Sequence, residues 1–316
     1  MNIILLGAAG FIGINLTLAL AKHPENHITV VSRHRASFAA VDAMALPNVR
    51  FVECDLVAEP DFSHLLDGQD VVYHLLSTTV PTTSNLQISQ ELNANVVLSA
   101  RLFEACAACG VKKVVFLSSG GTVYGKAASC PLCEDTPTNP ITSYGVQKLT
   151  IEKLLYLYHH IYGFDYRIIR LSNPYGPWQR PNGVLGAVTT FTYKALAHEP
   201  ITVYGDGSVV RDFIYIDDAV RGILNIVNGD SPQHLFNLGS GHGTCIRQVL
   251  DTICRELEVE PEIIWQEARP VDVPVNYLDI SRYEAAYGSL DPIPLESGIR
   301  KTADFLKRCY RLPESI

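Results

Sequence analysis

The chain has 316 residues, of which 47% are hydrophobic, and a formal net charge of −8. This length and apolar content suffice for a large buried core, which we expect to be organised as two unequal lobes. The acidic balance argues against a nucleic-acid-binding protein, because such proteins are usually basic. Phosphate groups of a substrate would then have to be bound by a few placed arginine residues.

Neither a targeting segment nor a membrane span is expected. The apolar run of residues 3–6 is too short for the hydrophobic region of a signal peptide, and it leads directly into a glycine loop. No stretch is long and apolar enough to cross a bilayer. The expectation that follows is a cytoplasmic protein with no membrane partner.

The first half of the chain alternates strands with helices. Continuous runs of Val, Ile and Leu predict strands that are buried on both faces. The predicted strands are 2–6, 27–32, 49–54, 71–75, 113–118 and 166–171, and the predicted helices are 10–22, 86–108 and 144–162. This repetition predicts an α/β fold with a doubly wound parallel sheet, the Rossmann fold.

After residue 171 the sequence changes in character. Glycine, proline and asparagine turn signals become frequent between short predicted elements. We therefore expect a Rossmann domain at 1–171, with a return segment around 209–240, and a smaller mixed α/β lobe at 172–208 and 241–316. The smaller lobe would lie over the carboxyl edge of the sheet and bind the substrate.

Three glycines follow the first strand and open the first helix: Gly7, Gly10 and Gly13, with Phe11 and Ile12 between the last two. Glycines there let the backbone turn sharply and approach a pyrophosphate, which the helix N-terminus binds through free N–H groups and its positive dipole. The motif predicts a bound nicotinamide dinucleotide. The alternative is a tight turn without a ligand.

The residues at the end of the second strand indicate whether NAD or NADP is bound. A carboxylate there favours NAD, but this chain has Ser32 and Arg33, with a second arginine at position 35. Because a guanidinium binds a 2′-phosphate through paired hydrogen bonds, the sequence favours NADP over NAD. The alternative is that both arginines are solvated loop residues.

The next two strand ends complete the predicted cofactor site. Asp55, after the third strand, is placed to accept a hydrogen bond from the adenine amine, or it caps a turn. Leu56 and His74 are the remaining predicted cofactor-binding residues.

Tyr144 and Lys148 are four residues apart and so share one face of a predicted helix. A free tyrosine has a pKa of ~10, and we expect the lysine and the nicotinamide charge to lower it. The tyrosinate would take the proton of a hydroxyl as a hydride leaves for the cofactor, while Lys148 also reaches the nicotinamide ribose. The alternative is an ordinary Tyr and Lys on a helix surface.

With these motifs the chain resembles the extended short-chain dehydrogenase/reductase superfamily. Within it, the chain is most similar to the nucleotide-sugar epimerase/dehydratase family, and in particular to UDP-glucose 4-epimerases. The segments that carry the resemblance are 7–13, 72–75, 117–125, 144–148, 170–177, 203–207, 211–218, 237–241 and 269–272.

The resemblance implies a role for individual residues. Tyr144 takes the position of the general base, and Lys148 that of its lysine. The residues that would bind the UDP-sugar are Asn173, Arg211, Arg269 and Asp272, with the two arginines on the diphosphate and Asp272 on the uridine ribose. The family also implies a homodimer through the helices at 86–108 and 144–162, whose apolar residues could instead be intramolecular core.

One position departs from the family pattern. The serine or threonine that usually bonds the reacting hydroxyl is replaced by Gly120, so Ser119, Thr122 or a water would have to act instead. The acidic pair of the family's dehydratases is also absent, since Gly121 and Thr122 stand there. This absence argues against a dehydratase.

Eight cysteines include the pairs Cys106/Cys109 and Cys130/Cys133, whose spacing is close to that of a zinc ribbon. The predicted strand at 113–118 lies between the pairs, which favours packing or loop cysteines over a tetrahedral zinc site. We therefore expect no metal and no disulfide.

The favoured function is a UDP-sugar 4-epimerase with tightly bound NAD(P). The alternatives are an NADP-dependent 4-ketosugar reductase or dehydrogenase, a UDP-glucuronate decarboxylase, and a non-catalytic NADP-binding protein. The presence of both Tyr144 and Lys148 argues against the last of these.

Overall fold

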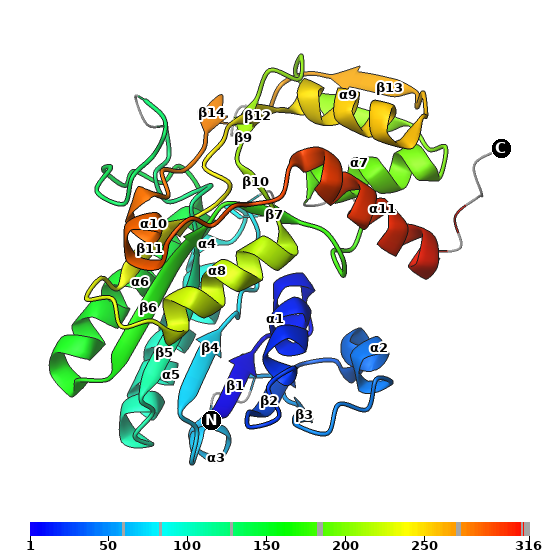
Figure 1. The fold of residues 1–316 in the computed structure, drawn as a ribbon. Coiled ribbons are helices and arrows are strands. Elements are labelled where there is room, and N and C mark those ends of the chain that lie inside the picture. Colours follow the sequence, from blue (N-terminus) through cyan, green and yellow to red (C-terminus); the bar gives the residue numbers. More distant parts are fainter. Residues whose placement is uncertain are drawn as a thin grey trace.

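The computed structural model describes residues 1–58, 61–81, 84–126, 129–181, 186–269, 273–310 and 312. Its centre is a parallel sheet of seven strands in the order β11-β6-β5-β4-β1-β2-β3 (Figure 1). The strands are β1 (Asn2–Leu6), β2 (His27–Ser32), β3 (Val49–Glu53), β4 (Val71–His74), β5 (Lys113–Ser119), β6 (Asp165–Leu171) and β11 (Leu235–Leu238). This order confirms the predicted doubly wound sheet.

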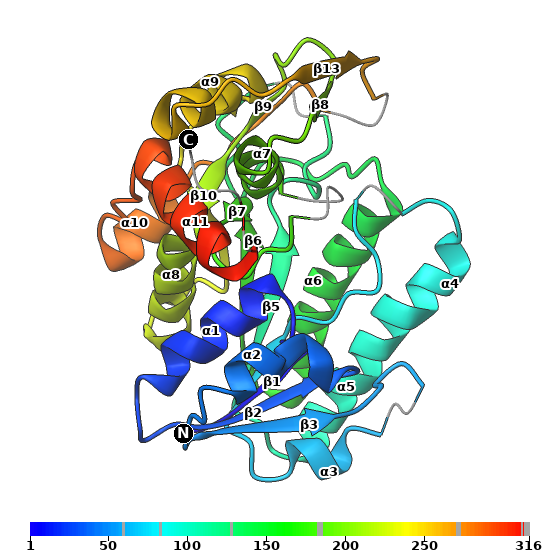
Figure 2. The same cartoon turned by 90° about the vertical axis from the view of Figure 1, so that its right-hand side faces the viewer.

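Helices cover both faces of the sheet. α1 (Phe11–Ala21) and α8 (Ile216–Asn228) lie on one face, and α5 (Leu98–Ala108) and α6 (Ser143–Tyr162) lie on the other (Figure 2). Alternate residues of each strand therefore enter different cores: Leu5 packs with the α1 side and Leu6 with the α5 side. Burial on both faces explains the unbroken apolar runs of the strands.

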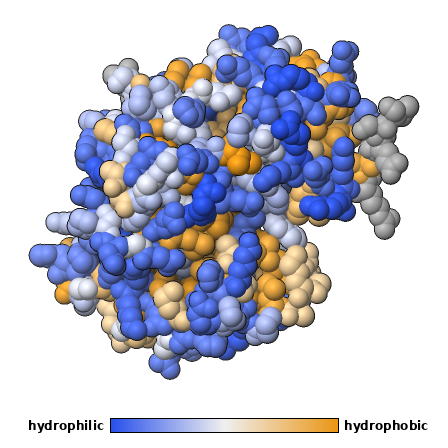
Figure 3. All heavy atoms as spheres, viewed as in Figure 1, coloured by the Kyte–Doolittle hydropathy of each residue, from blue (hydrophilic) through white to orange (hydrophobic). Residues whose placement is uncertain are grey.

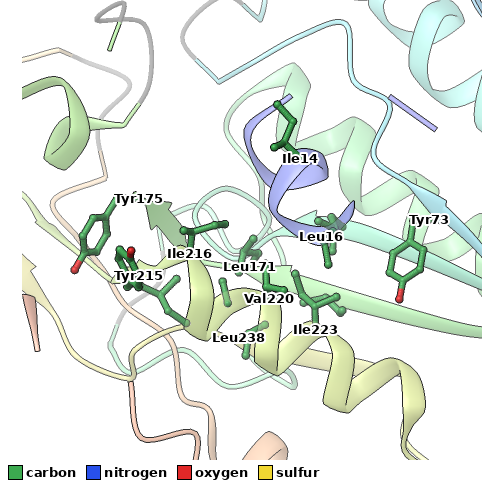
Figure 4. Packing of buried hydrophobic residues seen from close by; sticks show 14 of the residues in the cluster. Ile14, Leu16, Tyr73, Leu171, Tyr175, Tyr215, Ile216, Val220, Ile223 and Leu238 are labelled. Carbon is green, nitrogen blue, oxygen red and sulfur yellow. The ribbon is translucent and has the colours of Figure 1, made fainter. Parts of the chain in front are cut away.

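The core on the α1 side joins distant parts of the chain. Figure 4 shows Leu16 of α1 near Val220 and Ile223 of α8, beside Leu171 at the end of β6. β11, from the C-terminal half of the chain, extends the sheet by pairing with β6.

Most of the elements that follow β6 lie beyond the carboxyl ends of the strands (Figure 1). The helices are α7 (Ala187–Leu196), α9 (Ile246–Leu257), α10 (Ser281–Tyr287) and α11 (Leu295–Tyr310). The short strands pair as β7 (Asn173–Tyr175) with β10 (Phe213–Tyr215), β8 (Ile201–Tyr204) with β13 (Ile263–Gln266), and β9 (Val210–Arg211) with β12 (Thr244–Cys245) and β14 (Val275–Asn276).

The helix predicted at 86–108 begins later and is not regular. α4 (Ile88–Leu92) is followed by a π-helical turn at Asn93–Val97, and only then by α5. Asn95, inside this turn, donates to the Glu91 carbonyl and accepts from the Thr78 amide. These two hydrogen bonds of the Asn95 side chain stabilise the π-helical turn. Such turns are frequent near functional sites.

The face of the molecule seen in Figure 3 is largely hydrophilic, with hydrophobic residues gathered in separate patches. In the part of the chain that the structure describes, no helix combines the length and apolarity that a bilayer span requires.

Candidate active site

The glycine loop is shaped by two close contacts. Gly7 has φ +81°, and a Cβ there would lie 3.1 Å from the Leu76 backbone. A Cβ on Gly13 would lie 2.4 to 2.7 Å from backbone atoms of Ala8. At Gly10, by contrast, a Cβ would meet no atom of the described residues within 4 Å. Packing therefore requires glycine at 7 and 13, whereas Gly10 faces open space.

The N-terminus of α1 is free to bind an anion. Its N-cap is Gly10, which offers no side-chain cap, and the first turn with Phe11 and Ile12 contains no acidic residue. The first N–H groups of the helix therefore keep their hydrogen-bonding capacity, and the helix dipole favours negative charge there. The loop fits the pyrophosphate of a dinucleotide.

At the end of β2 the two arginines differ. The Nε of Arg35 donates to Asp42 Oδ2 at 2.8 Å, and its guanidinium lies over the Phe51 ring. Arg33 follows Ser32 and is exposed, with no polar partner within the described ranges. Only Arg33 therefore keeps an unengaged guanidinium for a 2′-phosphate.

Asp55 caps a turn, which is one of the two roles that the sequence predicted for it. Its Oδ1 accepts from the backbone N–H of Val57 at 3.0 Å and from that of Ala58 at 3.4 Å. The following residue, Leu56, is buried in the core on the α5 side. Contacts of Asp55 and Leu56 with a cofactor remain predictions.

His74 lies inside the protein against Phe103 and Phe116. Ser99 Oγ donates to the Asn95 carbonyl, so it accepts from His74 Nε2 at 2.7 Å, and this leaves Nδ1 unprotonated. Burial, with a smaller contribution from the Lys148 charge, lowers the pKa of His74 to about 3. The imidazole is therefore neutral, and its cofactor contact also stays a prediction.

Helix α6 places Tyr144 beside the turn that follows β5. Thr142 caps the helix by accepting from the Gly145 N–H at 3.2 Å. A Cβ on Gly145 would lie 2.9 Å from the Thr122 carbonyl oxygen, so the first turn of α6 packs directly on this segment. Tyr144 is half-buried, and its ring centroid lies 5.5 Å from Lys148 Nζ.

Lys148 is held by the neighbouring strand. Its Nζ donates to the Leu117 carbonyl at 2.8 Å and lies over the Phe116 ring. Burial lowers the pKa of Lys148 to about 8, although the Glu152 carboxylate opposes this shift. Burial raises the pKa of Tyr144 to about 12. The expectation that Lys148 lowers the Tyr144 pKa is therefore wrong for the protein alone, because desolvation of the phenol dominates.

The structure explains the glycine at position 120. A Cβ there would lie 2.6 Å from a methyl carbon of Leu278 and 3.1 Å from the Arg170 carbonyl oxygen. Leu278 therefore occupies the space that a serine or threonine side chain would need. Thr122 Oγ1 is buried without a hydrogen-bond partner among the described residues, and Ser119 Oγ lies 3.9 Å from the Cβ position of Gly121.

Asn173 and Arg211 lie on the short strands β7 and β9. Asn173 Nδ2 donates to the Asp212 carbonyl at 3.0 Å, and its Oδ1 lies 4.0 Å from the Cβ position of Gly121. Arg211 Nη1 donates to the carbonyls of Val210 at 2.8 Å and Val273 at 2.6 Å. The structure thus brings Asn173 to the turn that carries Ser119 and Thr122.

Arg269 is positioned by a contact with Tyr204. Its guanidinium stacks at 3.5 Å on the ring of Tyr204, at the end of the β8–β13 pair. Asp272 lies outside the described residues.

Asn276 lies beside the turn at Gly120, and the sequence did not point to it. It is 1% exposed, and its Nδ2 donates to the Gly120 carbonyl at 3.3 Å. Its Oδ1 is buried without a partner among the described residues, so it can accept from a ligand hydroxyl. An isolated asparagine so distant in the chain carries no sequence signal.

The cysteine pairs lie in different settings. Cys106 is buried in α5, and Cys109 follows that helix. Cys130 Sγ lies 3.6 Å from the Val275 carbonyl, and Cys133 contacts Thr136. The described residues contain no group of three or more His, Cys, Asp or Glu side chains that could hold a metal ion.

The fold and the site together define a protein that binds a dinucleotide at the carboxyl edge of a doubly wound sheet, with a Tyr–Lys pair beside it. Residues 3–239 match the NAD dependent epimerase/dehydratase family. The chain therefore belongs to this family, within the extended short-chain dehydrogenases/reductases, and the protein is an NAD(P)-dependent enzyme. The predicted resemblance is confirmed.

Known proteins support the same assignment. A UDP-glucose 4-epimerase of Mycolicibacterium smegmatis is 32% identical over 312 residues, 97% of this chain and 99% of the relative. A dTDP-4-dehydro-6-deoxyglucose reductase of Escherichia coli is 33% identical over 233 residues, 73% of this chain and 72% of that one. A UDP-glucuronic acid 4-epimerase of Bacillus cereus, in complex with UDP-glucuronic acid and NAD, has a TM-score of 0.88 at 27% identity, covering 98% of this chain and 100% of that one.

Proposed function

We propose that the protein is a UDP-sugar 4-epimerase. The observation that carries the proposal is the placement of Tyr144, above buried Lys148, against the turn that holds Ser119 and Thr122. A phenol, an ammonium and a hydroxyl at one edge of the sheet are the groups that reversible oxidation of a secondary alcohol needs. The epimerases among the relatives and neighbours support this function.

Tyr144 acts as the base at the C4 hydroxyl of the sugar. Burial raises the pKa of Tyr144 to about 12, so the phenol is protonated at neutral pH, and a second positive charge beside Lys148 would favour its ionisation. When bound, the oxidised nicotinamide supplies this charge and accepts a hydride. Ser119 or Thr122 bonds the reacting oxygen, and Tyr144 returns the proton after the 4-keto sugar has presented its other face.

The smaller lobe would hold the nucleotide while the sugar turns. Arg211 and Arg269 bind the diphosphate, Asp272 binds the uridine ribose, and Asn173 binds the sugar or a phosphate. Arg211 and Arg269 are each already fixed by contacts within the protein, which reduces the conformational entropy that binding costs.

We propose NADP as the cofactor, with Arg33 on the 2′-phosphate. The support is the absence of a carboxylate at the end of β2 and the exposed, unengaged Arg33 among the described residues. Mass spectrometry of the nucleotide extracted from the purified protein tests this directly. NADP supports the assignment, whereas NAD, as in the Bacillus cereus structure, refutes it.

The proposed reaction is tested by incubating the protein with UDP-glucose, UDP-GlcNAc and UDP-glucuronate and following the C4 configuration by NMR. We expect inversion at C4 of at least one substrate without added cofactor. Failure with all three defeats the proposal.

A second candidate is a nucleotide-4-ketosugar reductase, favoured by Arg33 and by the reductase of Escherichia coli among the relatives. A reductase consumes one NADPH for each sugar, whereas an epimerase consumes none. Loss of the NADPH absorbance with a 4-keto sugar, together with no inversion of UDP-sugars, selects this candidate.

We also propose a homodimer through α4, α5 and α6. The outer side of α6 exposes Val146, Leu157 and Ile161, and Ile88 and Val97 are exposed on the adjacent helical segment. This apolar face needs a partner, and a second copy supplies a matching one. Sedimentation equilibrium should give twice the chain mass, and Leu157→Asp should halve it.

A further inference from the structure

A buried polar network lies directly behind the Tyr144–Lys148 pair. Gln147, which is 2% exposed, is its centre. The Nε2 of Gln147 donates to Glu91 Oε2 at 3.1 Å and to Ser143 Oγ at 2.8 Å. The Oε1 of Gln147 accepts from Asn95 Nδ2 at 2.8 Å and from Thr79 Oγ1 at 3.4 Å.

The donors and acceptors of this network allow only one orientation of the Gln147 side-chain amide. Glu91 is 8% exposed and also accepts from Ser143 Oγ at 2.6 Å, and these bonds lower its pKa, so it is an ionised acceptor. The amide nitrogen of Gln147 must therefore face Glu91, and its oxygen must face Asn95. Asn95 Oδ1 in turn accepts from the Thr78 N–H at 2.9 Å.

The network fixes helix α6 against two other parts of the protein. Ser143 and Gln147 are four residues apart on one face of α6, immediately beside the face that carries Tyr144 and Lys148. Glu91 attaches the Ser143–Gln147 face to α4, and Asn95 attaches it to the loop after β4. Two anchors on one face oppose rotation of the helix about its axis, and that rotation would move the Tyr144 hydroxyl.

The same residues enclose a small pocket next to the catalytic pair. Gln147 and Asn95 line it together with Ser77, Tyr144 and Lys148. The loop after β4, the buried polar network and the Tyr144–Lys148 pair therefore line one and the same pocket.

We propose that Gln147, through Glu91 and Asn95, is a positioning residue that sets the orientation of Tyr144 in the reaction. The inference rests on the proposed function, because it assigns Gln147 to the step in which Tyr144 moves a proton.

The test is the isosteric Gln147→Glu variant of the holoenzyme, assayed against pH. When protonated, the introduced carboxyl reproduces the donor to Glu91 and the acceptor for Asn95. Two ionised carboxylates in contact repel, so the introduced carboxyl and Glu91 share one proton at low pH. Besides Glu91, the titratable groups that line the same pocket as Gln147 among the described residues are Tyr144 and Lys148, and the wild-type profile contains their contribution. We therefore measure the ratio of variant to wild-type kcat at each pH.

We expect this ratio to be near one at the lowest pH that the enzyme tolerates and to fall at least about tenfold by pH ~8, because the shared proton is then lost. KM for the UDP-sugar should change less than about twofold, as expected when only a transition-state interaction is lost. The Glu91→Gln/Gln147→Glu double variant restores a single carboxylate and should flatten the ratio.

The control is Gln248→Glu, which changes the same side chain in the capping box of α9 and should give a flat ratio. A flat ratio for Gln147→Glu, or a fall that the double variant does not remove, overturns the inference. Tyr144→Phe separates the two proposals. An active Tyr144→Phe enzyme defeats the proposed function, whereas an inactive one beside a pH-independent Gln147→Glu ratio defeats only the role of Gln147.

Discussion

The glycine loop and the turn after β5 are both built around glycines, but their neighbours come from different distances along the chain. Gly13 packs against Ala8 within its own loop, whereas Gly120 packs against Leu278, near the other end of the chain. The Gly13 contact lies within a short motif, whereas no short motif contains both Gly120 and Leu278. The cofactor half of the site at Gly13 can therefore be predicted from the sequence, whereas the substrate half around Gly120 depends on the assembled fold.

We expect the largest change in kcat for a substitution at Tyr144, which lies between the cofactor half and the substrate half of the site. Tyr144→Phe removes the proton-transfer group and keeps the ring, so kcat should fall about 10²- to 10⁴-fold. Steady-state epimerisation assays measure the loss, and the mass of the retained cofactor shows that the site is intact. An enzyme that keeps most of its turnover contradicts the role of Tyr144.

Within the cofactor half, Gly13 and Gly10 differ in the space around them. Gly13→Ala should lower the free energy of unfolding by about 1–3 kcal/mol or more, because its Cβ meets the Ala8 backbone, and backbone cannot move aside as a side chain can. Gly10→Ala is the matched control, since its Cβ meets open space among the described residues. Urea unfolding should show little change in the stability of the control. Equal destabilisation by both variants would contradict the packing argument.

Sequence patterns predicted most of the fold and part of the site. The strand at His27–Ser32 has its predicted bounds, because its four central β-branched residues suit a strand that is buried on both faces. The π-helical turn around Asn95 was not predicted, since it depends on bonds from Asn95 to Thr78, which lies on another segment. The pKa of Tyr144 was expected to move downward, because spacing shows a neighbouring lysine but not the loss of solvent.

The contact between Gly120 and Leu278 in the substrate half can be tested with a double-mutant cycle. Gly120→Ser should cost about 1–3 kcal/mol of stability by overpacking against Leu278. Leu278→Ala creates a cavity and should cost about 2–5 kcal/mol by itself. The double variant should be more stable than the two losses combined predict, by about 0.5–3 kcal/mol, because each change relieves the other.

Urea unfolding of the four proteins in this cycle measures the coupling. Strict additivity would show that Leu278 does not fill the position of the missing side chain. Recovery of stability with a gain in turnover would further show that the hydroxyl introduced by Gly120→Ser bonds the reacting oxygen.

The smallest effect is the pH dependence due to Lys148. Its folded pKa of about 8 lies below the ordinary value of 10.5, so the unfolded chain binds more protons between these values. Stability from this group therefore rises with pH from about 8 to 10.5 and is absent below about 8. Over the same interval the charge beside Tyr144 is lost, and turnover should decline.

Lys148→Arg keeps the charge at every accessible pH. Its turnover should be lower, because the planar guanidinium does not fit the ammonium site, but the alkaline decline above about pH 8 should disappear. An unchanged alkaline decline in kcat would assign it to another group.

The proposed mechanism requires a hydride that leaves C4 and returns to the same carbon within one bound complex. The UDP-sugar that the protein inverts, deuterated at C4 and incubated with the holoenzyme without added cofactor, tests this most directly when products are followed by NMR and mass spectrometry. We predict that the 4-epimer forms with deuterium still at C4 and that Tyr144→Phe slows its formation about 10²- to 10⁴-fold. Inversion with loss of the deuterium to solvent would contradict hydride return to C4.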